Sequence, residues 1–515
     1  MAEAGRCCRS TSRRAVQCLR RAGGVQTARR WASTASADQG SEKERVVILG
    51  SGWAGYALAR KLSPAKATRI LISPRSHFVF TPLLASTSVG TLEFRAAIEP
   101  VRRLGLAEFH QAWATDIDFG RKVIRVEANT RGDVGAVTGA REAAKGPEFD
   151  VAYDKLVLAV GCYSQTFGIE GVEQHACFLR DIGDARIIRL RVLEAFEKAA
   201  LPTTGDGERR RLLHFAVVGG GPTGIEFAAE LHDLVHEDLA KLYPALMPHV
   251  AISVYDIAPK VLPMFDRNLA TYATDMFARQ GIRVKTEHHL ERIRRDGDAL
   301  MLRIREEPDE LGAGLVVWST GLTQNPLTGR LLGRHVRLGG GGLGGRIARD
   351  ARTGGIVTDG HMRVQLTASG TDHDDASSSS SSSSSTETTT TTTTATTATT
   401  ITLPDVYAIG DCAAVQGQRL PATAQVASQQ AAYLARQFNR GGGGSAFRFR
   451  NLGTMAYLGS WRAIHQSSAD ELKGWAAWML WRTAYLTRSM SVRNKLLIPV
   501  YWLATWIFGR DISRF

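Results

Sequence analysis

The chain has 515 residues, with 64 Lys and Arg against 50 Asp and Glu, which gives a formal net charge of +14, and 44% of its residues are hydrophobic. This composition is typical of a globular protein and excludes a collagen, a disulfide-rich mini-protein and a wholly disordered chain. The length predicts two or three domains. No run of about 18 apolar residues occurs, so no transmembrane helix is expected.

The positive charge gathers at the two ends of the chain. Residues 1–35 hold eight Arg and one acid, and residues 440–515 hold eleven Lys and Arg against three acids, so the body between them is nearly neutral. A nucleic-acid-binding protein would have a basic body, so no nucleic-acid partner is expected. The first end is rich in Arg, Ser and Thr, which is typical of a mitochondrial transit peptide, although a basic tail would have the same composition.

A glycine-rich turn follows the apolar run at 44–49 and precedes a predicted helix. Its Gly50, Gly52 and Gly55 fit the pattern G-x-G-x-x-G. The first glycine allows a tight turn, the second lets the backbone approach a pyrophosphate, and the third lets the helix pack on the strand. The strand–turn–helix context strengthens this prediction of a dinucleotide site.

The next apolar run, 68–72, is not followed by the acid that such sites usually carry. Ser73 stands there and is able to bond a ribose hydroxyl, and Arg75 is able to lie against a phosphate or an adenine. The first turn therefore leaves open which adenine nucleotide binds.

A second turn of the same kind follows the apolar run at 212–218. Gly219, Gly221 and Gly224 fit the pattern, and Asp256 closes the next predicted strand. A carboxylate accepts from both ribose hydroxyls and repels a 2′-phosphate, so this turn predicts NADH rather than NADPH. Glu226 is expected in the first turn of the following helix, where it would contact the nicotinamide amide or only favour the helix dipole.

Two dinucleotide sites in one chain suggest a tightly held flavin and an exchanging nicotinamide. Two later segments support this interpretation. Residues 317–321 form a strand and turn that would close over a dinucleotide, and residues 407–412 end a strand with Asp411, placed to bond the ribityl hydroxyls of a flavin. Between them, residues 336–401 are rich in Gly, Ser and Thr and predict a disordered insertion.

The basic C-terminal end carries six of the ten Trp residues of the chain. Trp475, Trp478, Trp481 and Tyr485 recur close to one helical face. Residues 496–508 form an apolar run that is too short to cross a bilayer. The pattern predicts a helix lying in the membrane interface. The alternative is a buried helix pair, for example at a dimer interface, and the two interpretations do not exclude each other.

In combination these motifs resemble the fungal type II NADH dehydrogenases, the rotenone-insensitive, alternative NADH:ubiquinone oxidoreductases of mitochondria. The resemblance runs from about residue 44 to the C-terminus, apart from the insertion and smaller loops. The segments that carry it are 50–55, Ser73-Pro74-Arg75, 80–84, 88–91, 219–226, 407–411 and Ala424-Gln425-Val426-Ala427-Ser428-Gln429.

The resemblance implies an α/β flavoprotein with two Rossmann-like dinucleotide-binding domains, a C-terminal amphipathic, membrane-anchoring helical domain, and usually a homodimer. The implied domains are a transit peptide (1–35), an FAD domain (44–205 and 402–440), an NADH domain (206–335), the insertion (336–401) and the anchor (445–515). FAD would bind Gly50, Ser51, Gly52, Trp53, Ala54, Gly55, Ser73, Arg75, Thr81, Pro82, Gly410 and Asp411. NADH would bind Gly219, Gly220, Gly221, Pro222, Thr223, Gly224, Asp256, Thr320 and Gly321. Glu226 would lie near the nicotinamide, and Gln425 and Gln429 would line the quinone pocket.

The implied reaction passes a hydride from NADH to FAD and then two electrons to ubiquinone in the respiratory chain, without proton pumping. The protein would sit peripherally on the mitochondrial inner membrane, with the matrix face favoured, and no metal is expected. Two features depart from the family pattern, since a Glu is more usual than Asp256 and the Ser- and Thr-rich insertion is not a family feature.

Two other classes of function are considered. A sulfide:quinone oxidoreductase shares the fold and the membrane tail but needs a redox-active Cys pair, for which the body of the chain offers only Cys162, Cys177 and Cys412. No CxxC spacing occurs among them. A binding or signalling flavoprotein such as apoptosis-inducing factor would need a basic body, which this chain lacks.

Overall fold

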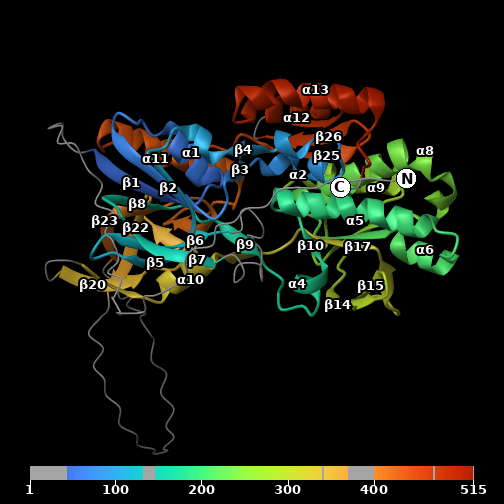
Figure 1. Cartoon of the computed structure of the whole chain (residues 1–515), viewed down its shortest axis with the longest axis horizontal. Coiled ribbons are helices and arrows are strands. Elements are labelled where there is room, and N and C mark those ends of the chain that lie inside the picture. Colours follow the sequence, from blue (N-terminus) through green and yellow to red (C-terminus); the bar gives the residue numbers. More distant parts are fainter. Residues whose placement is uncertain (1–42, 131–144, 339–341, 369–399, 468–469, 514–515) are drawn as a thin grey trace, which may run out of the picture. The chain divides into compact units, whose positions relative to one another are not determined.

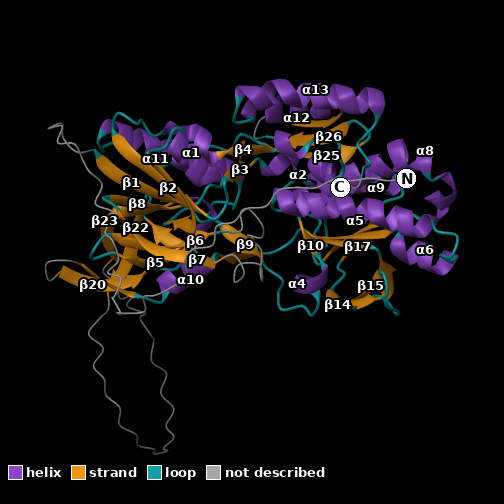
Figure 2. Ribbon diagram, in the orientation of Figure 1, coloured by secondary structure: helices purple, strands orange, loops and turns teal. Residues whose placement is uncertain are grey.

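The computed structural model describes residues 43–130, 145–338, 342–368, 400–467 and 470–513. Lys43–Phe515 form one compact unit. The predicted transit peptide and the Ser- and Thr-rich tract lie outside the described residues. Figures 1 and 2 show two α/β regions and, along the top of the view, the C-terminal helices.

The first sheet has the order β19-β20-β22-β23-β8-β1-β2-β5-β6-β7, and its centre, from β23 to β5, is parallel. The central strands are buried on both faces, which explains why they read as continuous apolar runs. Helices α1 (Trp53–Lys61) and α11 (Ala424–Arg440) lie side by side (Figure 1). The strands are β1 (Glu44–Leu49), β2 (Ala67–Ser73), β5 (Glu108–Asp118), β6 (Val123–Asn129), β7 (Lys145–Ala152), β8 (Lys155–Leu158), β19 (His335–Leu338), β20 (Gly342–Ile347), β22 (Arg363–Ala368) and β23 (Thr400–Ala408), with β21 (Ile356–Thr358) and β24 (Ala413–Val415) attached.

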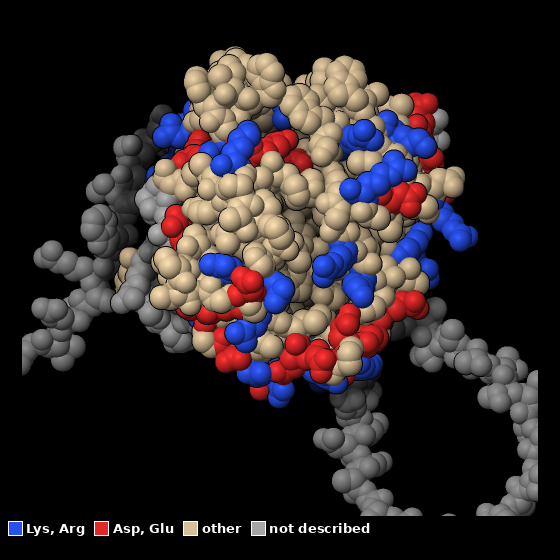
Figure 3. Space-filling model, turned by 90° about the vertical axis from the view of Figure 1, so that its right-hand side faces the viewer, with Lys and Arg blue, Asp and Glu red and all other residues tan. Residues whose placement is uncertain are grey.

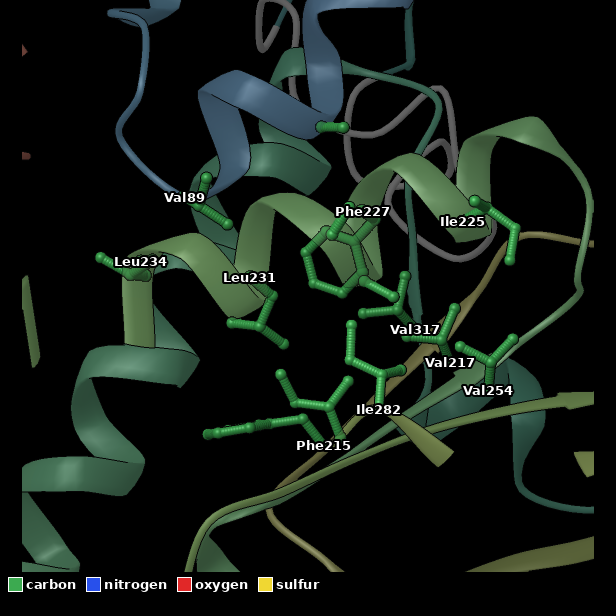
Figure 4. Close-up of a cluster of buried hydrophobic side chains, with 14 of the residues drawn as sticks. Val89, Phe215, Val217, Ile225, Phe227, Leu231, Leu234, Val254, Ile282 and Val317 are labelled. Atoms are coloured by element: carbon green, nitrogen blue, oxygen red, sulfur yellow. The ribbon is translucent and has the colours of Figure 1, made fainter. Parts of the chain in front are cut away.

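The second sheet is wholly parallel, in the order β10-β17-β11-β12-β13. Side chains of its central strands, among them Phe215, Val217 and Val254, point toward Phe227 and Leu231 of α7 (Figure 4). The strands are β10 (Cys177–Phe178), β11 (His214–Val218), β12 (Ala251–Asp256), β13 (Arg283–Thr286) and β17 (Leu315–Trp318), and the helices are α5 (Ile182–Ala200), α6 (Asp206–Leu212), α7 (Pro222–Asp233) and α9 (Arg267–Arg279).

The C-terminal part consists of an antiparallel sheet, β25-β26-β27, followed by two helices. Strand β25 packs against α7, and Trp481 of α12 donates to Glu226 of α7, so the small sheet and α12 rest on the second α/β region. Helix α13 instead contacts the first region, where Asn494 donates to Glu99. None of the helices within the described residues is long and apolar enough to cross a membrane. The elements are β25 (Thr454–Gly459), β26 (Arg462–Gln466), β27 (Glu471–Gly474), α12 (Trp475–Arg488) and α13 (Val492–Phe508).

Short elements complete the chain. The helix that follows the second glycine-rich turn continues beyond α7, with a π-helical turn at Leu234–Leu239 and its end in α8 (Ala240–Leu242). The others are β3 (His77–Val79), β4 (Ile98–Pro100), α2 (Leu84–Ser88), β9 (Cys162–Ser164), α4 (Val172–His175), β14 (Leu290–Asp296), β15 (Ala299–Ile304), β16 (Leu311–Ala313), β18 (Leu322–Gln324), α10 (Pro326–Leu332) and the 3-10 turns at Thr81–Leu83, Phe94–Ala96, Val101–Leu104, Pro244–His249 and Gly410–Cys412.

Two expected domain boundaries differ from the structure. The FAD domain was expected to extend to residue 205, but β10 pairs with β17, so the second sheet begins before residue 180. The insertion was expected to begin at residue 336, but β19, β20 and β22 return to the first sheet. The sequence did not reveal these pairings, because β10 has only two residues and β20 is rich in glycine, so neither stands out as an apolar run.

Candidate functional site

The first glycine-rich turn joins β1 to α1, and at two of its positions the protein's own backbone leaves no room for a side chain. Gly50 has a φ of +108°, and a Cβ added there would lie 2.3 Å from the carbonyl oxygen of Ala159. A Cβ on Gly55 would lie 1.9 Å from the carbonyl oxygen of Gly50. At Gly52 a Cβ would meet nothing within 4 Å, and no side chain caps the helix that begins beside it. The turn thus leaves open space over free backbone N–H groups, which fits a pyrophosphate.

The second turn, between β11 and α7, has the same geometry. Gly219 has a φ of +114°, and a Cβ on Gly224 would lie 2.0 Å from the carbonyl oxygen of Gly219. Gly221, like its counterpart in the first turn, has open space where a Cβ would be, and the N-terminus of α7 has no side-chain cap. Pro222 occupies the first helical position, where its missing N–H costs nothing. The residues of both turns therefore fit dinucleotides.

Side chains predicted to surround the first turn do come together. Ser51 Oγ lies 2.8 Å from Ser73 Oγ, and Trp53 Nε1 donates to Thr81 Oγ1 at 3.0 Å, directly before Pro82. Ser73 is buried, and its hydroxyl already bonds the Ser51 hydroxyl and the N–H of Arg75. A ribose hydroxyl would therefore have to share Ser73 with these partners.

Arg75 is fixed by a carboxylate that the sequence analysis did not single out. Its Nε lies 2.7 Å from Asp181 Oδ2, at the N-terminus of α5. The Arg75 guanidinium and the neighbouring His77 hold the pKa of Asp181 below its usual value, although burial acts in the opposite direction and is the largest influence. This ion pair joins the first α/β region to the second.

Gly410 and Asp411 lie beside the first turn, although about 360 residues separate them from it in the sequence. A Cβ on Gly410 would lie 3.2 Å from the Cβ of Ala54 in α1. The N–H of Gly410 donates to Gln430 Oε1 at 2.7 Å, and Gln430 is buried in α11. Sequence reasoning missed Gln430, although it directly follows the glutamine motif. The turn therefore presents Asp411 at the same edge of the sheet as the glycine-rich turn.

The three cysteines of the body are free thiols. Burial raises the pKa of Cys162 and of Cys177 to about 11 and that of Cys412 to about 12. Cys162 Sγ donates to Asp411 Oδ2 at 3.4 Å. Because a thiolate is the reactive form, these protonated thiols do not suit the sulfide:quinone alternative.

Asp256 lies at the second turn, as predicted, and already has partners there. Its carboxylate accepts from the N–H of Gly220 and, at 2.7 Å, from the N–H of Ala258. The strand β17 ends nearby, where Ser319 Oγ donates to the carbonyl oxygen of Val218 at 3.0 Å. Thr320 and Gly321 follow, the latter with a φ of +76°. The predicted NADH residues are thus gathered at the carboxyl ends of β11, β12 and β17.

Glu226 is the fifth residue of α7 and so lies beyond the first turn, which removes the helix-dipole interpretation. Its Oε1 accepts from the backbone N–H of Tyr457 and from Trp481 Nε1, both at 3.1 Å. Burial raises the pKa of Glu226 to about 8, with a smaller contribution from Glu230, and the two hydrogen bonds oppose the rise. The sequence did not indicate this contact with the C-terminal part.

Gln425 and Gln429 lie one turn apart on one face of α11, as predicted. Each amide makes two hydrogen bonds to the backbone of the chain that follows. Gln425 bonds the Gly453 carbonyl at 3.2 Å and the Leu452 N–H at 2.9 Å, and Gln429 bonds the carbonyl and N–H of Arg450 at 2.8 and 3.0 Å. Their amides therefore hold the segment that leads into β25.

The C-terminal tryptophans divide between the core and the surface. Trp478 and Trp481 are buried, whereas Trp475 is 61% exposed, so most of the predicted aromatic face of α12 packs inward. Helix α13 instead presents an exposed apolar face, formed by Val492, Leu496, Val500, Leu503, Trp506, Ile507 and Phe508. The top of Figure 3 shows uncharged side chains, with Lys, Arg, Asp and Glu below them.

Comparisons with known proteins identify the family of the chain. The family described as "Pyridine nucleotide-disulphide oxidoreductase" matches residues 44–368, and "NDH2 C-terminal domain" matches residues 451–511. A "Probable NADH dehydrogenase" of Dictyostelium discoideum is 36% identical, over 92% of each chain. An "Internal alternative NAD(P)H-ubiquinone oxidoreductase A1, mitochondrial" of Solanum tuberosum is 34% identical, over 93% of this chain and 89% of its own. An "External NADH-ubiquinone oxidoreductase 2, mitochondrial" of Saccharomyces cerevisiae is 31% identical, over 93% and 84%.

The fold also has a close counterpart among solved structures. The structure of NDH2 from Plasmodium falciparum in complex with NADH has a TM-score of 0.75, covering 92% of this chain and 100% of its own at 24% identity. At that identity the comparison shows a shared fold.

Proposed function

The chain belongs to the type II NADH dehydrogenases of the pyridine nucleotide-disulphide oxidoreductase family, and we propose that it oxidises NADH through a bound FAD and passes the electrons to ubiquinone. The observation that carries this is the pair of glycine-rich turns. Each has open space at its middle glycine and an uncapped helix N-terminus, and the Gly410–Asp411 turn adjoins only the first of them.

FAD is assigned to the first turn. Gly50, Gly52 and Gly55 with the N-terminus of α1 would hold its pyrophosphate, and Asp411 would accept from its ribityl hydroxyls. Thr81, Pro82 and the Trp53 indole flank this turn. When bound, the flavin accepts a hydride from NADH and gives two electrons to the quinone, and the chain's own residues orient the partners and exclude water.

NADH is assigned to the second turn, with Gly219–Gly224 at the pyrophosphate and Asp256 at the ribose. A carboxylate there repels the 2′-phosphate of NADPH, so NADPH is expected to be the poorer donor. Thr320 and Gly321, at the end of β17, would close over the nicotinamide end. Glu226 lies deeper in the same helix, where it fastens the C-terminal part to the NADH domain.

The quinone is assigned to the side of α11 that carries Gln425 and Gln429. Their amides hold residues 450–453 against the helix, so we infer that they shape the quinone pocket through that segment. Replacing Gln425 by Ala should slow oxidation of the reduced enzyme by ubiquinone while leaving flavin reduction by NADH fast. Equal slowing of both steps would contradict this assignment.

The exposed apolar face of α13 is proposed to lie in the interface of a membrane. Its side chains cover one side of the helix for its whole length, and the C-terminal end of the chain is basic. We place the protein peripherally on the mitochondrial inner membrane, with the matrix face favoured, and expect a homodimer.

An anaerobic titration tests the cofactor assignments. The purified, detergent-solubilised protein should release FAD on denaturation, and its flavin absorbance should be bleached by one equivalent of NADH and far more slowly by NADPH. A flavin that NADH does not bleach would overturn the proposal, and equal bleaching by NADPH would remove the role of Asp256.

A further inference from the structure

A groove lies between α11 and the chain that follows it, and it borders the proposed quinone side of α11 at Gln429 and Arg450. It encloses about 530 Å³ and is walled by α11 from Gln429 to Arg436 on one side and by residues 445–450 on the other. Gln425 does not line it, and the groove extends from Gln429 away from the Gly410–Asp411 turn, toward the C-terminal half of α11.

The groove is strongly basic. Arg436, Arg448 and Arg450 line it, and no Asp or Glu does. Among the described residues, none of the three guanidinium groups has a hydrogen-bond or ion-pair partner, and all three residues are exposed. Arg448 and Arg450 are two residues apart, so an extended segment places them on the same side. Three unpaired guanidinium groups around one hollow leave a positive charge that nothing in the wall neutralises.

The walls of the groove are held by hydrogen bonds on both sides. Gln429 makes its two bonds to the backbone of Arg450, and the Tyr433 hydroxyl donates to the carbonyl oxygen of Ser445 at 3.0 Å. The N–H of Phe447 donates to the carbonyl of Gly360 at 2.8 Å, and Tyr433 and Phe447 are both buried. The segment that carries two of the arginines is therefore fixed before any ligand arrives, which lowers the entropic cost of binding.

We propose that this groove binds a phosphate group. Planar guanidinium forks bond phosphate oxygens in pairs, and three of them suit a doubly charged or diester phosphate better than a carboxylate. The favoured source is an acidic phospholipid, because α11 packs along α1, and Arg60 of α1 donates to the Met490 carbonyl at 2.7 Å just before α13, the helix with the exposed apolar face. This choice of source rests on the membrane docking proposed above, whereas the phosphate chemistry does not.

The test uses the full-length protein with its flavin and three triple variants. The first, R436Q/R448Q/R450Q, removes the charge of the groove. The second, K473Q/R488Q/K495Q, removes the same charge from exposed positions elsewhere in the C-terminal part and is the matched control. The third, L496Q/V500Q/L503Q, removes apolar side chains from α13. Retained flavin and an unchanged melting temperature show that a variant is folded, and R448Q alone serves if the first triple variant is not.

Two ligands are measured for each protein. Binding of pyrophosphate in detergent, with saturating NAD⁺ present to occupy the second glycine-rich turn, should weaken at least tenfold in the groove variant and stay unchanged in the other two. Binding to phosphatidylcholine vesicles that contain phosphatidylglycerol should exceed binding to pure phosphatidylcholine vesicles, and the groove variant should lose this preference more than the matched control does.

The outcomes separate the alternatives. Pyrophosphate binding that is absent, or that falls equally in the groove variant and the matched control, overturns the site. Specific pyrophosphate binding without a lipid preference supports the site and identifies a soluble phosphate as its source. If the α13 variant still binds both kinds of vesicle, the membrane docking fails while the phosphate site stands.

Discussion

Gly52 and Gly221 differ from the glycines beside them in what an added methyl group would meet. Gly50, Gly55, Gly219 and Gly224 are enforced by their own backbone surroundings, because a Cβ would strike a carbonyl or side-chain oxygen at 2.9 Å or less. The middle glycine of each turn has no such neighbour within 4 Å. A side chain at Gly52 or Gly221 would therefore collide with a bound ligand and not with the protein.

The substitution Gly221→Ala should therefore leave the fold and the bound flavin intact and weaken the binding of NADH. We expect an unchanged melting temperature, full flavin content and a Kd for NADH that is at least tenfold higher, because a methyl group would occupy the space of the pyrophosphate. Gly224→Ala is the contrasting variant and should be poorly folded. Unchanged NADH affinity in Gly221→Ala would place the nicotinamide cofactor elsewhere.

Gln430 gives a second prediction at the scale of single residues. Gln430→Leu removes the acceptor of the Gly410 N–H and leaves that partly buried donor without its protein partner, at a cost of up to about 1–3 kcal/mol. The Gly410–Asp411 turn should loosen, and flavin should dissociate faster in dilution experiments. Gln430→Glu keeps the acceptor oxygen and should retain more flavin than Leu, and equal loss from both variants would argue against this hydrogen bond.

Glu226 predicts a dependence of stability on pH. Burial raises its pKa in the folded protein from the ordinary 4.5 to about 8, so between these values the folded protein holds a proton that the unfolded chain releases. The contribution of this carboxyl to stability is therefore full below pH 4.5 and is lost as the pH rises to about 8. Glu226→Gln removes the titration and keeps an acceptor oxygen for Tyr457 and Trp481.

The measurement compares melting temperatures at pH 5 and pH 8. The decrease in melting temperature from pH 5 to pH 8 should be smaller in Glu226→Gln than in the parent protein by about 4 °C or more. A change of 1 kcal/mol in stability shifts the melting temperature of a large domain by about 2–4 °C. Glu173→Gln, at an exposed position of α4, is the control and should melt like the parent protein. Parallel curves for the parent protein and Glu226→Gln would show that Glu226 is ionised throughout.

At the scale of elements, α13 shows how a helix divides its faces. Ile498 and Asn494 are buried against the first α/β region, and Asn494 Nδ2 donates to Glu99 Oε1 at 2.8 Å. The opposite face carries apolar side chains that are at least half exposed, from Val492, which is 74% exposed, to Phe508, which is 85% exposed. Pro499 lies in the middle of the helix.

Replacing Leu496, Val500 and Leu503 by Gln should release the protein from vesicles of neutral lipid. Loss of apolar burial at three positions should weaken binding by about 10- to 100-fold, measured by sedimentation with the vesicles. Ile187→Gln with Leu190→Gln, at exposed apolar positions of α5, is the control and should bind like the parent protein. Unchanged binding of the α13 variant would show that another surface docks.

The sequence predicted the elements that adjoin the two turns and mistook others. Central parallel strands such as β1 and β11 are buried on both faces, so their apolar runs stand out. Strands β20 and β10 escaped notice, because one is rich in glycine and the other has only two residues. The aromatic face of α12 was assigned to the membrane, although Trp478 and Trp481 pack inside, since helical periodicity identifies an apolar face but not what covers it.

At the scale of the whole molecule, α7 ties the C-terminal part to the NADH domain through a row of carboxylates. Glu226 accepts from Tyr457 and Trp481, and three residues after Glu230, Asp233 accepts from the Tyr457 hydroxyl at 2.6 Å. Glu230 itself accepts from Ser86 in α2 and from Thr91 just after it, and α2 packs against α5 and α7. One helix that begins at the NADH turn thus contacts both the C-terminal part and the α2 segment.

This arrangement marks what could and could not be predicted for the site. Motif spacing predicted where both turns, Asp256 and Asp411 lie at the strand ends, because the sequence pattern dictates the local backbone geometry there. Gln430, Asp181 and the partners of Glu226 became visible only in the fold, since they act across hundreds of residues and follow no short pattern.

In the proposed reaction, one flavin receives electrons from NADH and gives them to ubiquinone. The most direct test is a two-step anaerobic stopped-flow experiment on the purified protein, first with one equivalent of NADH and then with a soluble ubiquinone. We predict rapid bleaching of the flavin, rapid recovery on mixing with the quinone, and one ubiquinol formed for each NADH consumed. A flavin that NADH bleaches but that ubiquinone fails to reoxidise would contradict the account.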